Sequence, residues 1–352
     1  MASYQELMIP MKILDWIDIN KLQLSKMSLN ENAVAYLYQH SELINWRLIC
    51  KSKNAIYLIN MLQDKEIRWS NWRPVFLSWI YLSENENAIE LLWKNIEKID
   101  WYYLSCNKNG IDILKYYKDK IIWPFLCEQE KAAKWIYTQY PTIKDDICWE
   151  RLCENQSIEA MLLLEDNKDK INYTLLSGNK FAERFFKDNL DKICYDYLSS
   201  NESSWAMDIL KYHLDEANWL ELSANYYAID ILKNNIDKIF WCDFCINKNP
   251  EAIPIIKDNL SRLRKMDWSI LSSNSNAIEI LKDNQDKISF NNLTYNPAIF
   301  MIDYEVIKKK TEVIKKDIIE KALHPRRFTY YLTHYSYNIC NDEYDGEYDG
   351  DV

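Results

Sequence analysis

The chain has 352 residues with a formal net charge of −10 at pH 7, and 48% of the residues are hydrophobic. Only 4 residues are glycine, against about 25 at average usage, which excludes glycine-rich phosphate loops and disfavours folds with many tight turns. The acidic charge disfavours nucleic acid as a partner, and the uncharged stretch 74–83 is about half the length of a membrane-spanning helix. We therefore expect a soluble, all-α, cytoplasmic protein that binds neither nucleic acid nor membrane.

In chain order, residues 1–23 are predicted to form an N-terminal cap, and a repeat then occupies residues 24–301. Its pattern, I-x-W-x-x-L-S-x-N-x-x-A-I-x-x-L-K, is clearest in residues 99–115 and 266–282. Large apolar anchors recur, mostly 22 to 24 residues apart, at Leu24, Trp46, Trp69, Trp101, Trp123, Trp149, Tyr173, Tyr195, Trp219, Trp241, Trp268 and Phe290. Such a period indicates a tandem array.

Each repeat reads as two short helices. The anchor and the leucine three residues later share one face of the first helix, and a Ser or Cys follows where neighbouring helices approach closely. An Asn six residues after the anchor then begins the second helix, which carries A-I-x-x-L and ends at another Asn, in most repeats followed by D-K-I. Since such a pair cannot bury its own apolar face, we predict an αα-solenoid of about twelve ~22-residue units. Stacked in line, they would form a rod on the order of 100 Å long.

Three aromatic groups depart from the repeat. The segment between Trp69 and Ala88 is about ten residues longer than usual and includes Trp72 and Phe76. The pairs Tyr102-Tyr103 and Tyr226-Tyr227 occupy positions that are polar in other repeats. Exposed aromatic residues favour partner binding, so these six are candidate binding residues. The alternative for all six is packing against neighbouring residues. For Trp72 and Phe76, this would mean that they cover an imperfect joint between the N-terminal cap and the regular array.

The C-terminal region differs from the array. Residues 302–340 are predicted to form capping helices, the first of them amphipathic with a basic face. Residues 341–352 hold two copies of Glu-Tyr-Asp-Gly and are predicted to be a disordered acidic tail.

Sequence motifs give no support for catalysis or for a metal site. Cys242 and Cys245 form the only C-x-x-C, and no second pair stands at zinc-site spacing. The four histidines are dispersed, and no nucleophile motif is present. The nine cysteines are interpreted as free thiols, with buried, unligated side chains at the small-residue positions Cys50, Cys127, Cys153 and Cys245. We expect neither a cofactor nor an enzymatic activity.

The unit W-x-x-L-S-x-N-x-x-A-I-x-x-L-K-x-N-x-D-K-I resembles the short tandem repeats of uncharacterised proteins of giant DNA viruses of the mimivirus type. The ending His324-Pro325-Arg326-Arg327, followed by Tyr330-Tyr331-Leu332, is similar to the ending of those proteins. The unit is also distantly similar to ankyrin repeats, although the T-P-L-H signature and the glycine turn are missing. The resemblance implies a viral protein in the host cytoplasm or viral factory, and it supplies no catalytic residues.

Taken together, the pattern favours a non-enzymatic protein-protein interaction scaffold whose partner is a host or viral protein. The alternative is a structural component of the virion or of its assembly, in which the array itself is the function. The Trp anchors of the array, Trp46, Trp69, Trp101, Trp123, Trp149, Trp219, Trp241 and Trp268, are expected to be structural and buried between layers.

Overall fold

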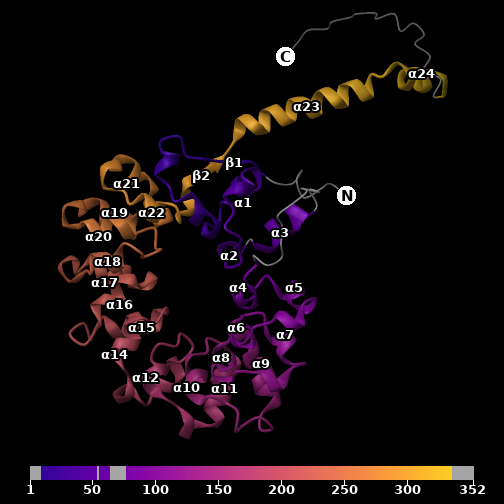
Figure 1. Ribbon diagram of the computed structural model, residues 1–352. Coiled ribbons are helices and arrows are strands. Elements are labelled where there is room, and N and C mark those ends of the chain that lie inside the picture. Colours follow the sequence, from indigo (N-terminus) through magenta and orange to yellow (C-terminus); the bar gives the residue numbers. More distant parts are fainter. Residues whose placement is uncertain (1–8, 54, 64–76, 335–352) are drawn as a thin grey trace, which may run out of the picture. The chain divides into compact units, whose positions relative to one another are not determined.

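The computed structural model describes residues 9–53, 55–63 and 77–334 (Figure 1). Within these residues the chain is mostly helical, with two three-residue strands, β1 (Met11–Ile13) and β2 (Phe300–Ile302), which pair with each other. The predicted all-α class is therefore confirmed. The chain divides into two compact bodies at residues 301 and 302, which we call the N-terminal body and the C-terminal body.

The first helix of each sequence repeat is short. In the described part of the chain these helices are η2 (Leu24–Leu29), α2 (Trp46–Ile49), α4 (Trp79–Glu84), α6 (Trp101–Cys106), α8 (Trp123–Glu128), α10 (Trp149–Glu154), α12 (Tyr173–Leu176), α14 (Tyr195–Ser199), α16 (Trp219–Ala224), α18 (Trp241–Phe244), α20 (Lys265–Leu271) and α22 (Phe290–Leu293). Most begin at the anchor because the residue before it has an extended backbone. Where that residue is Asp or Asn, its side chain caps the helix, as Asp100 and Asn218 do.

The second helices follow after two to five residues in most repeats. They are α1 (Val34–Gln39), α3 (Ala55–Gln63), α5 (Ile89–Trp93), α7 (Ile111–Leu114), α9 (Glu130–Gln139), α11 (Ile158–Asp166), α13 (Glu183–Phe186), α15 (Ser204–Leu210), α17 (Ile229–Lys233), α19 (Ala252–Asp258) and α21 (Ile278–Asp283). In the last repeat the 3₁₀ turn η14 (Pro297–Ile299) and strand β2 take this place. The second Asn of the motif ends several of these helices by donating to the carbonyl four residues earlier, as Asn95 and Asn235 do.

The anchor of the third repeat is Trp79 rather than Trp69. Helix α4 begins at Trp79, and Leu82, Ser83 and Asn85 follow at the motif spacing and are buried. The extra residues therefore precede the first helix of this repeat and follow α3, so they do not lengthen that first helix. Trp69 itself lies outside the described residues.

The core follows the motif with one correction. The residue three positions after each anchor is buried in every repeat, from Met27 to Leu293. The anchors themselves are half-buried at Trp46, Trp101, Trp123, Trp149, Trp219 and Trp241, and only Trp268 is fully buried as expected. The leucine positions, and not the tryptophans, therefore form the centre of the layers.

The lysine of D-K-I covers several of these half-exposed anchors. Lys98 lies 4.8 Å from the ring centre of Trp79, and Lys238 lies 4.7 Å from that of Trp219. In each case the lysine precedes one anchor and covers the anchor of the repeat before it. The cation–π contact explains why a lysine recurs at this position, which the sequence pattern alone left unexplained.

The conserved spacing of the motif asparagines has a direct structural reason. The side-chain nitrogen of Asn179 donates to the backbone oxygens of Cys153 and Asn155 in the preceding repeat, at 2.9 and 2.8 Å. Its oxygen accepts from the backbone N–H of Phe181 and so holds the following turn. Equivalent bonds between repeats recur at Asn30, Asn85, Asn107, Asn155, Asn201, Asn225, Asn247, Asn274 and Asn296. We call this series the asparagine ladder.

The small-residue position carries a second series of bonds between repeats. The hydroxyl of Ser199 donates to the carbonyl of Tyr195 and accepts from the backbone N–H of Asn218 in the next repeat, at 2.9 Å. The thiols of Cys127 and Cys153 accept the equivalent N–H at 3.4 Å. The side chain at this position must therefore be small and must also accept a hydrogen bond. Close packing alone predicted only the small size.

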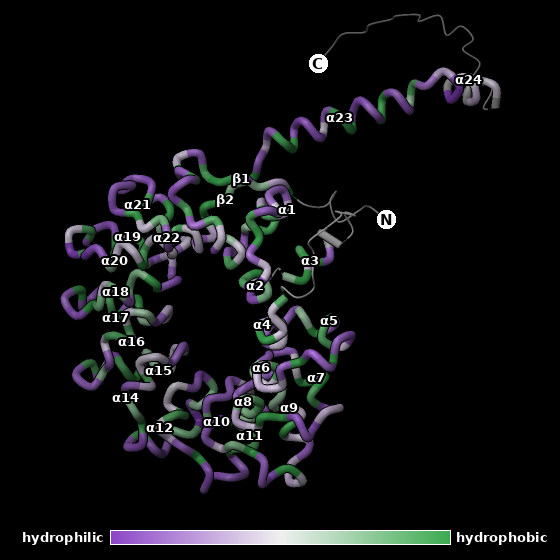
Figure 2. The backbone as a smooth tube through the Cα atoms, in the orientation of Figure 1, coloured by the Kyte–Doolittle hydropathy of each residue, from purple (hydrophilic) through white to green (hydrophobic). Residues whose placement is uncertain are grey.

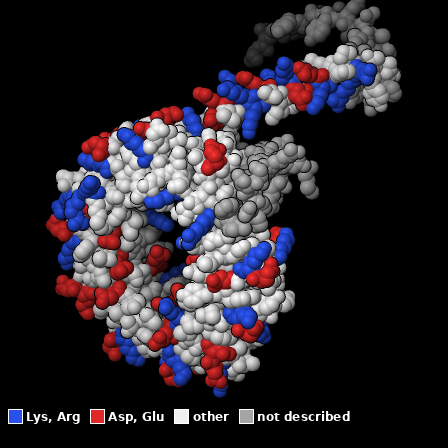
Figure 3. All heavy atoms as spheres, viewed as in Figure 1, with Lys and Arg blue, Asp and Glu red and all other residues white. Residues whose placement is uncertain are grey.

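The two ends of the array contact each other within the N-terminal body. Asn30 donates to the carbonyls of Thr294 and Asn296, and the hydroxyl of Thr294 accepts from the N–H of Gln23. Lys21 lies 5.1 Å from the ring centre of Phe290, as the equivalent lysines lie against other anchors. The first repeat thus follows the last in the same register, and Figure 3 shows an opening in the middle of this body. The expected rod is wrong, because the array closes on itself.

Closure also changes the interpretation of the predicted caps. Strand β1 pairs with β2, and Leu14 donates to the carbonyl of Ile299 at 2.9 Å, so the N-terminal residues form part of a joint.

The C-terminal body contains α23 (Tyr304–Ala322) and α24 (Pro325–His334). Asp303 caps α23 by accepting from the N–H of Val306, and no residue of α23 is buried. Hydrophilic and hydrophobic residues alternate along this helix (Figure 2). The predicted acidic tail lies outside the described residues.

Candidate protein-interaction surface

Helices α6 and α8 present three neighbouring aromatic side chains, which we call the aromatic patch: Tyr102, Tyr103 and Phe125. Tyr102 is 49% exposed, and its ring centre lies 4.6 Å from that of Phe125 and 5.2 Å from that of Tyr103. These residues stand one or two positions after their anchors, on the side of the helix away from the buried leucines. The patch therefore joins two repeats on the surface of the N-terminal body.

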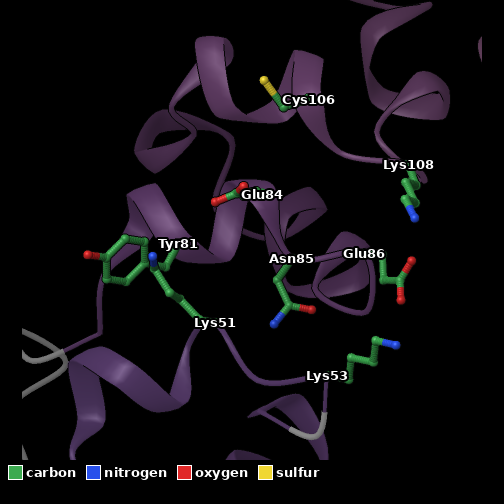
Figure 4. Close-up of a pocket in the computed structure, with 8 residues that line it drawn as sticks. All are labelled: Lys51, Lys53, Tyr81, Glu84, Asn85, Glu86, Cys106 and Lys108. Carbon is green, nitrogen blue, oxygen red and sulfur yellow. The ribbon is translucent and has the colours of Figure 1, made fainter. Parts of the chain in front are cut away.

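A groove of about 350 Å³ begins beside the patch (Figure 4). Its lining belongs to the repeats of α2, α4 and α6 and consists of Lys51, Lys53, Tyr81, Glu84, Asn85, Glu86, Cys106 and Lys108. Cys106 lies one turn after Tyr102 in α6, so this helix contributes to both the patch and the groove. The two features together form one candidate surface.

One end of the groove combines an aromatic ring with cations. Lys51 lies 4.2 Å from the ring centre of Tyr81, and the guanidinium of Arg47 lies 5.8 Å from it. Figure 4 shows Lys51 beside this ring, while Glu84 projects from the same helix as Tyr81, α4, and Glu86 from the turn after it. A partner segment would thus meet an apolar ring, ammonium groups and carboxylates within one concave surface.

The asparagine ladder fixes the floor of the groove. Asn85 donates to the carbonyls of Cys50 and Ser52, both at 2.8 Å, and is buried. Asn87 holds the carbonyl of Lys53, and Asn109 holds that of Glu86. Because the backbone on both sides of the groove is bonded between repeats, the groove is formed before a partner arrives.

The cysteine in the groove favours binding over covalent chemistry. Burial raises the pKa of the Cys106 thiol, and the nearby carboxylates of Glu84, Glu128 and Asp100 raise it further. A thiol with a raised pKa is protonated at neutral pH and is a poor nucleophile. In the described part of the chain, no three His, Cys, Asp or Glu side chains gather into a possible metal site.

The four small-residue cysteines are buried, as predicted, and none of them forms a disulfide. Burial raises the pKa of Cys127 and Cys245 to about 12 and that of Cys50 and Cys153 to about 11. The thiols of Cys127 and Cys153 accept hydrogen bonds from the next repeat, which gives these two a structural role.

The structure brings together only some of the sequence candidates. Tyr102 and Tyr103 belong to the aromatic patch, whereas Tyr226 and Tyr227 form a separate pair in η9 (Tyr226–Ala228), with ring centres 5.4 Å apart. Both residues of that second pair are exposed. Trp72 and Phe76 lie outside the described residues.

Sequence reasoning missed Phe125 and the groove. Phe125 stands two residues after its anchor, where Tyr103 stands in its repeat and where Arg151 and Asp243 stand in others. The same comparison between repeats that singled out Tyr103 could have found it. No comparison between repeats could have found the groove. The extra residues lie between Lys51 and Tyr81, and they led to Trp69 instead of Trp79 being taken as the anchor of the third repeat.

Comparison of the chain with protein-family models, with characterised proteins and with solved structures gives no match. No described helix combines the length and the apolar character needed to cross a bilayer. The function must therefore be argued from the geometry of the molecule.

Proposed function

We propose that the chain is a non-enzymatic protein-protein interaction scaffold, built as a closed αα-solenoid of about twelve helix pairs. The observation that carries this proposal is the aromatic patch beside a preformed groove of mixed charge. Aromatic residues supply contact area at a small entropic cost and are enriched among the residues that dominate binding energies.

The side chains of the candidate surface indicate which kind of partner segment would bind there. A bound segment would place apolar side chains on Tyr102 and Phe125, and polar or charged groups along the groove between Lys51 and Lys108. The backbone bonds of the ladder would keep this surface rigid, so binding would order mainly the partner. The resemblance to giant-virus repeats makes a host or viral protein in the cytoplasm the partner that we propose.

The test uses affinity capture from infected cells, followed by binding measurements with the purified partner. Replacing Tyr102 and Phe125 together with Ala should weaken binding at least tenfold, because residues at the centre of an interface typically contribute more than 1 kcal/mol each. The matched control is Tyr212→Ala, since Tyr212 is 87% exposed and lies outside the patch and the groove.

The melting temperature of each variant is measured as well, to separate lost binding from lost folding. Equal melting temperatures for the double variant and the wild type, together with weaker binding, would support the proposal. Unchanged binding by the double variant, or an equal loss with Tyr212→Ala, would contradict it.

A further inference from the structure

Helix α23 carries a continuous apolar stripe along its length. With 100° between successive residues, one face collects the side chains of Tyr304, Ile307, Thr311, Ile314, Ile318 and Ala322. Their spacing of three or four residues keeps them in line over about 27 Å, at 1.5 Å per residue. The stripe therefore runs along the whole length of α23.

Lysines border this stripe on both sides. Lys308 and Lys315 lie next to it on one edge, and Lys310 and Lys321 lie next to it on the other. The other side of the helix has mixed character, with Glu305, Glu312 and Glu320 beside Lys309, Lys316 and Val313. Asp317 lies beyond Lys321 and forms an ion pair with it at 2.7 Å. The charge next to the apolar face is consequently positive.

Among the described residues of the C-terminal body, nothing covers the stripe. Tyr304 is 67% exposed, and Ile314 and Ile318 are each 59% exposed. Helix α24 contacts α23 and adds Arg326 and Arg327, both exposed, to the positive charge of these two helices. Exposing apolar side chains of this size to water is unfavourable, so a face on which they are aligned is suited to a partner that covers it.

We propose that α23 lies flat on an anionic lipid surface, with its apolar stripe inserted between the headgroups and its lysines beside the lipid phosphates. An apolar face with lysines along both of its borders is the pattern of an interfacial helix. Nucleic acid offers the phosphates but no apolar layer for the stripe. A second copy of α23 offers an apolar face but would bring lysine borders against each other.

This inference goes beyond the proposed scaffold function and does not depend on it. The net charge of −10 led to the expectation that the chain avoids membranes, but most acidic residues lie outside α23 and α24, which hold eight Lys and Arg against four Asp and Glu; six further acidic residues follow at 342–351. Screening limits their influence to about 8 Å at physiological salt, so the local positive charge of α23 decides the interaction at the lipid surface. The scaffold would then present its partner next to a membrane.

The experiment is flotation of the full-length protein with vesicles of phosphatidylcholine alone, or of phosphatidylcholine with 30% phosphatidylserine. We expect binding to the anionic vesicles at 0.1 M salt, with at least tenfold weaker binding to the neutral ones. Ile314→Gln with Ile318→Gln should lower binding at least tenfold, and so should Lys308→Gln with Lys315→Gln. The control is Val313→Gln with Lys316→Gln, which replaces one apolar side chain and one lysine away from the stripe and should bind like the wild type.

Circular dichroism of each variant verifies that α23 remains helical. The proposal is overturned if the anionic vesicles do not bind the protein, or if the control pair loses as much binding as the stripe variants. It is also overturned if sedimentation shows a dimer that the two isoleucine changes dissociate, or if duplex DNA binds wild type and isoleucine variant alike and displaces the vesicles.

Discussion

The side-chain nitrogen of Asn30 donates to the carbonyl oxygen of Thr294 at 2.8 Å, across a separation of 264 residues. The same nitrogen bonds the carbonyl of Asn296, which repeats the geometry of Asn296 on Ser272 and Asn274. The joint between the first and last repeats is therefore chemically equivalent to the joints between consecutive repeats. It holds the circle of contacts closed.

Breaking this joint should expose both of its sides together. Asn30→Asp replaces the two donations with a carboxylate that faces carbonyl oxygens, a strongly unfavourable contact. Amide hydrogen exchange in residues 14–33 and 290–301 should then accelerate at least tenfold, as Leu14 and Gln23 lose their partners. The exposed Asn20→Ala serves as the control and should leave both segments protected. Faster exchange on only one side would contradict a closed joint.

Asn179→Asp tests the ladder within the array. The change keeps the shape of the side chain but removes both donations and buries a carboxylate beside two carbonyls, so it should cost roughly 3–5 kcal/mol of unfolding free energy. Asn172→Asp is the matched control, because Asn172 only caps α12 by accepting from Leu175, which Asp does equally well. Urea unfolding of both variants provides the measurement, and similar stabilities would refute the role of the ladder.

The array was predictable from the sequence because its motif repeats the same residue types at the same spacing. The motif identified the buried leucines, the small-residue cysteines and the turn asparagines. It did not identify the anchor Trp79, because Trp69 and Trp72 offered alternative anchors in the longer segment before it. Closure was not predictable either. The residues around Leu24 and Asn30 keep the spacing of the motif, but a linear sequence does not indicate whether a first repeat meets solvent or the last repeat.

The candidate surface was predictable only in part. Tyr102 and Tyr103 stood out because the equivalent positions are polar in other repeats. The groove requires Lys51 and Lys108 to lie near each other although 57 positions separate them, and this proximity depends on the register of α4. Contacts between repeats determine such surfaces, and a motif describes only one repeat at a time.

Ser199→Ala should reveal the second series of bonds between repeats. The change removes the acceptor of the Asn218 N–H, a part-buried donor, which should cost about 1 kcal/mol. Its neighbour Ser200 is exposed and bonds only the carbonyl of Tyr197 within the same helix, so Ser200→Ala should change stability by less than about 0.5 kcal/mol. The two variants are compared by urea unfolding, and equal effects would show that the position merely has to be small.

The buried thiols should make stability fall at alkaline pH. Burial raises the pKa of Cys127 to about 12 and that of Cys153 to about 11, from 9.0. Above pH 9 the unfolded chain therefore loses protons that the folded chain keeps. The stabilising contribution is complete below pH 9 and is lost as the pH rises toward 11–12, by at most about 1.4 kcal/mol per pH unit for each thiol.

The double variant Cys127→Ser with Cys153→Ser isolates this effect, because serine occupies the same position in other repeats and does not titrate in this range. Its unfolding free energy should fall less between pH 8 and pH 10.5 than that of the wild type. Parallel losses in the two proteins would assign the alkaline instability to other groups, such as tyrosines and lysines.

Closure of the N-terminal body restricts how this sequence can vary. In an open array, a duplicated or deleted repeat merely changes the length. In a closed array, the same change would alter the angle between neighbouring repeats at every joint. The joints are held by paired hydrogen bonds of fixed length, so they tolerate little change in angle. Gains and losses of whole repeats are therefore disfavoured, and variation is expected in segments outside the bonded turns, such as the second helices. The number of repeats in this body behaves as a discrete property that a lineage would conserve even where its sequence drifts.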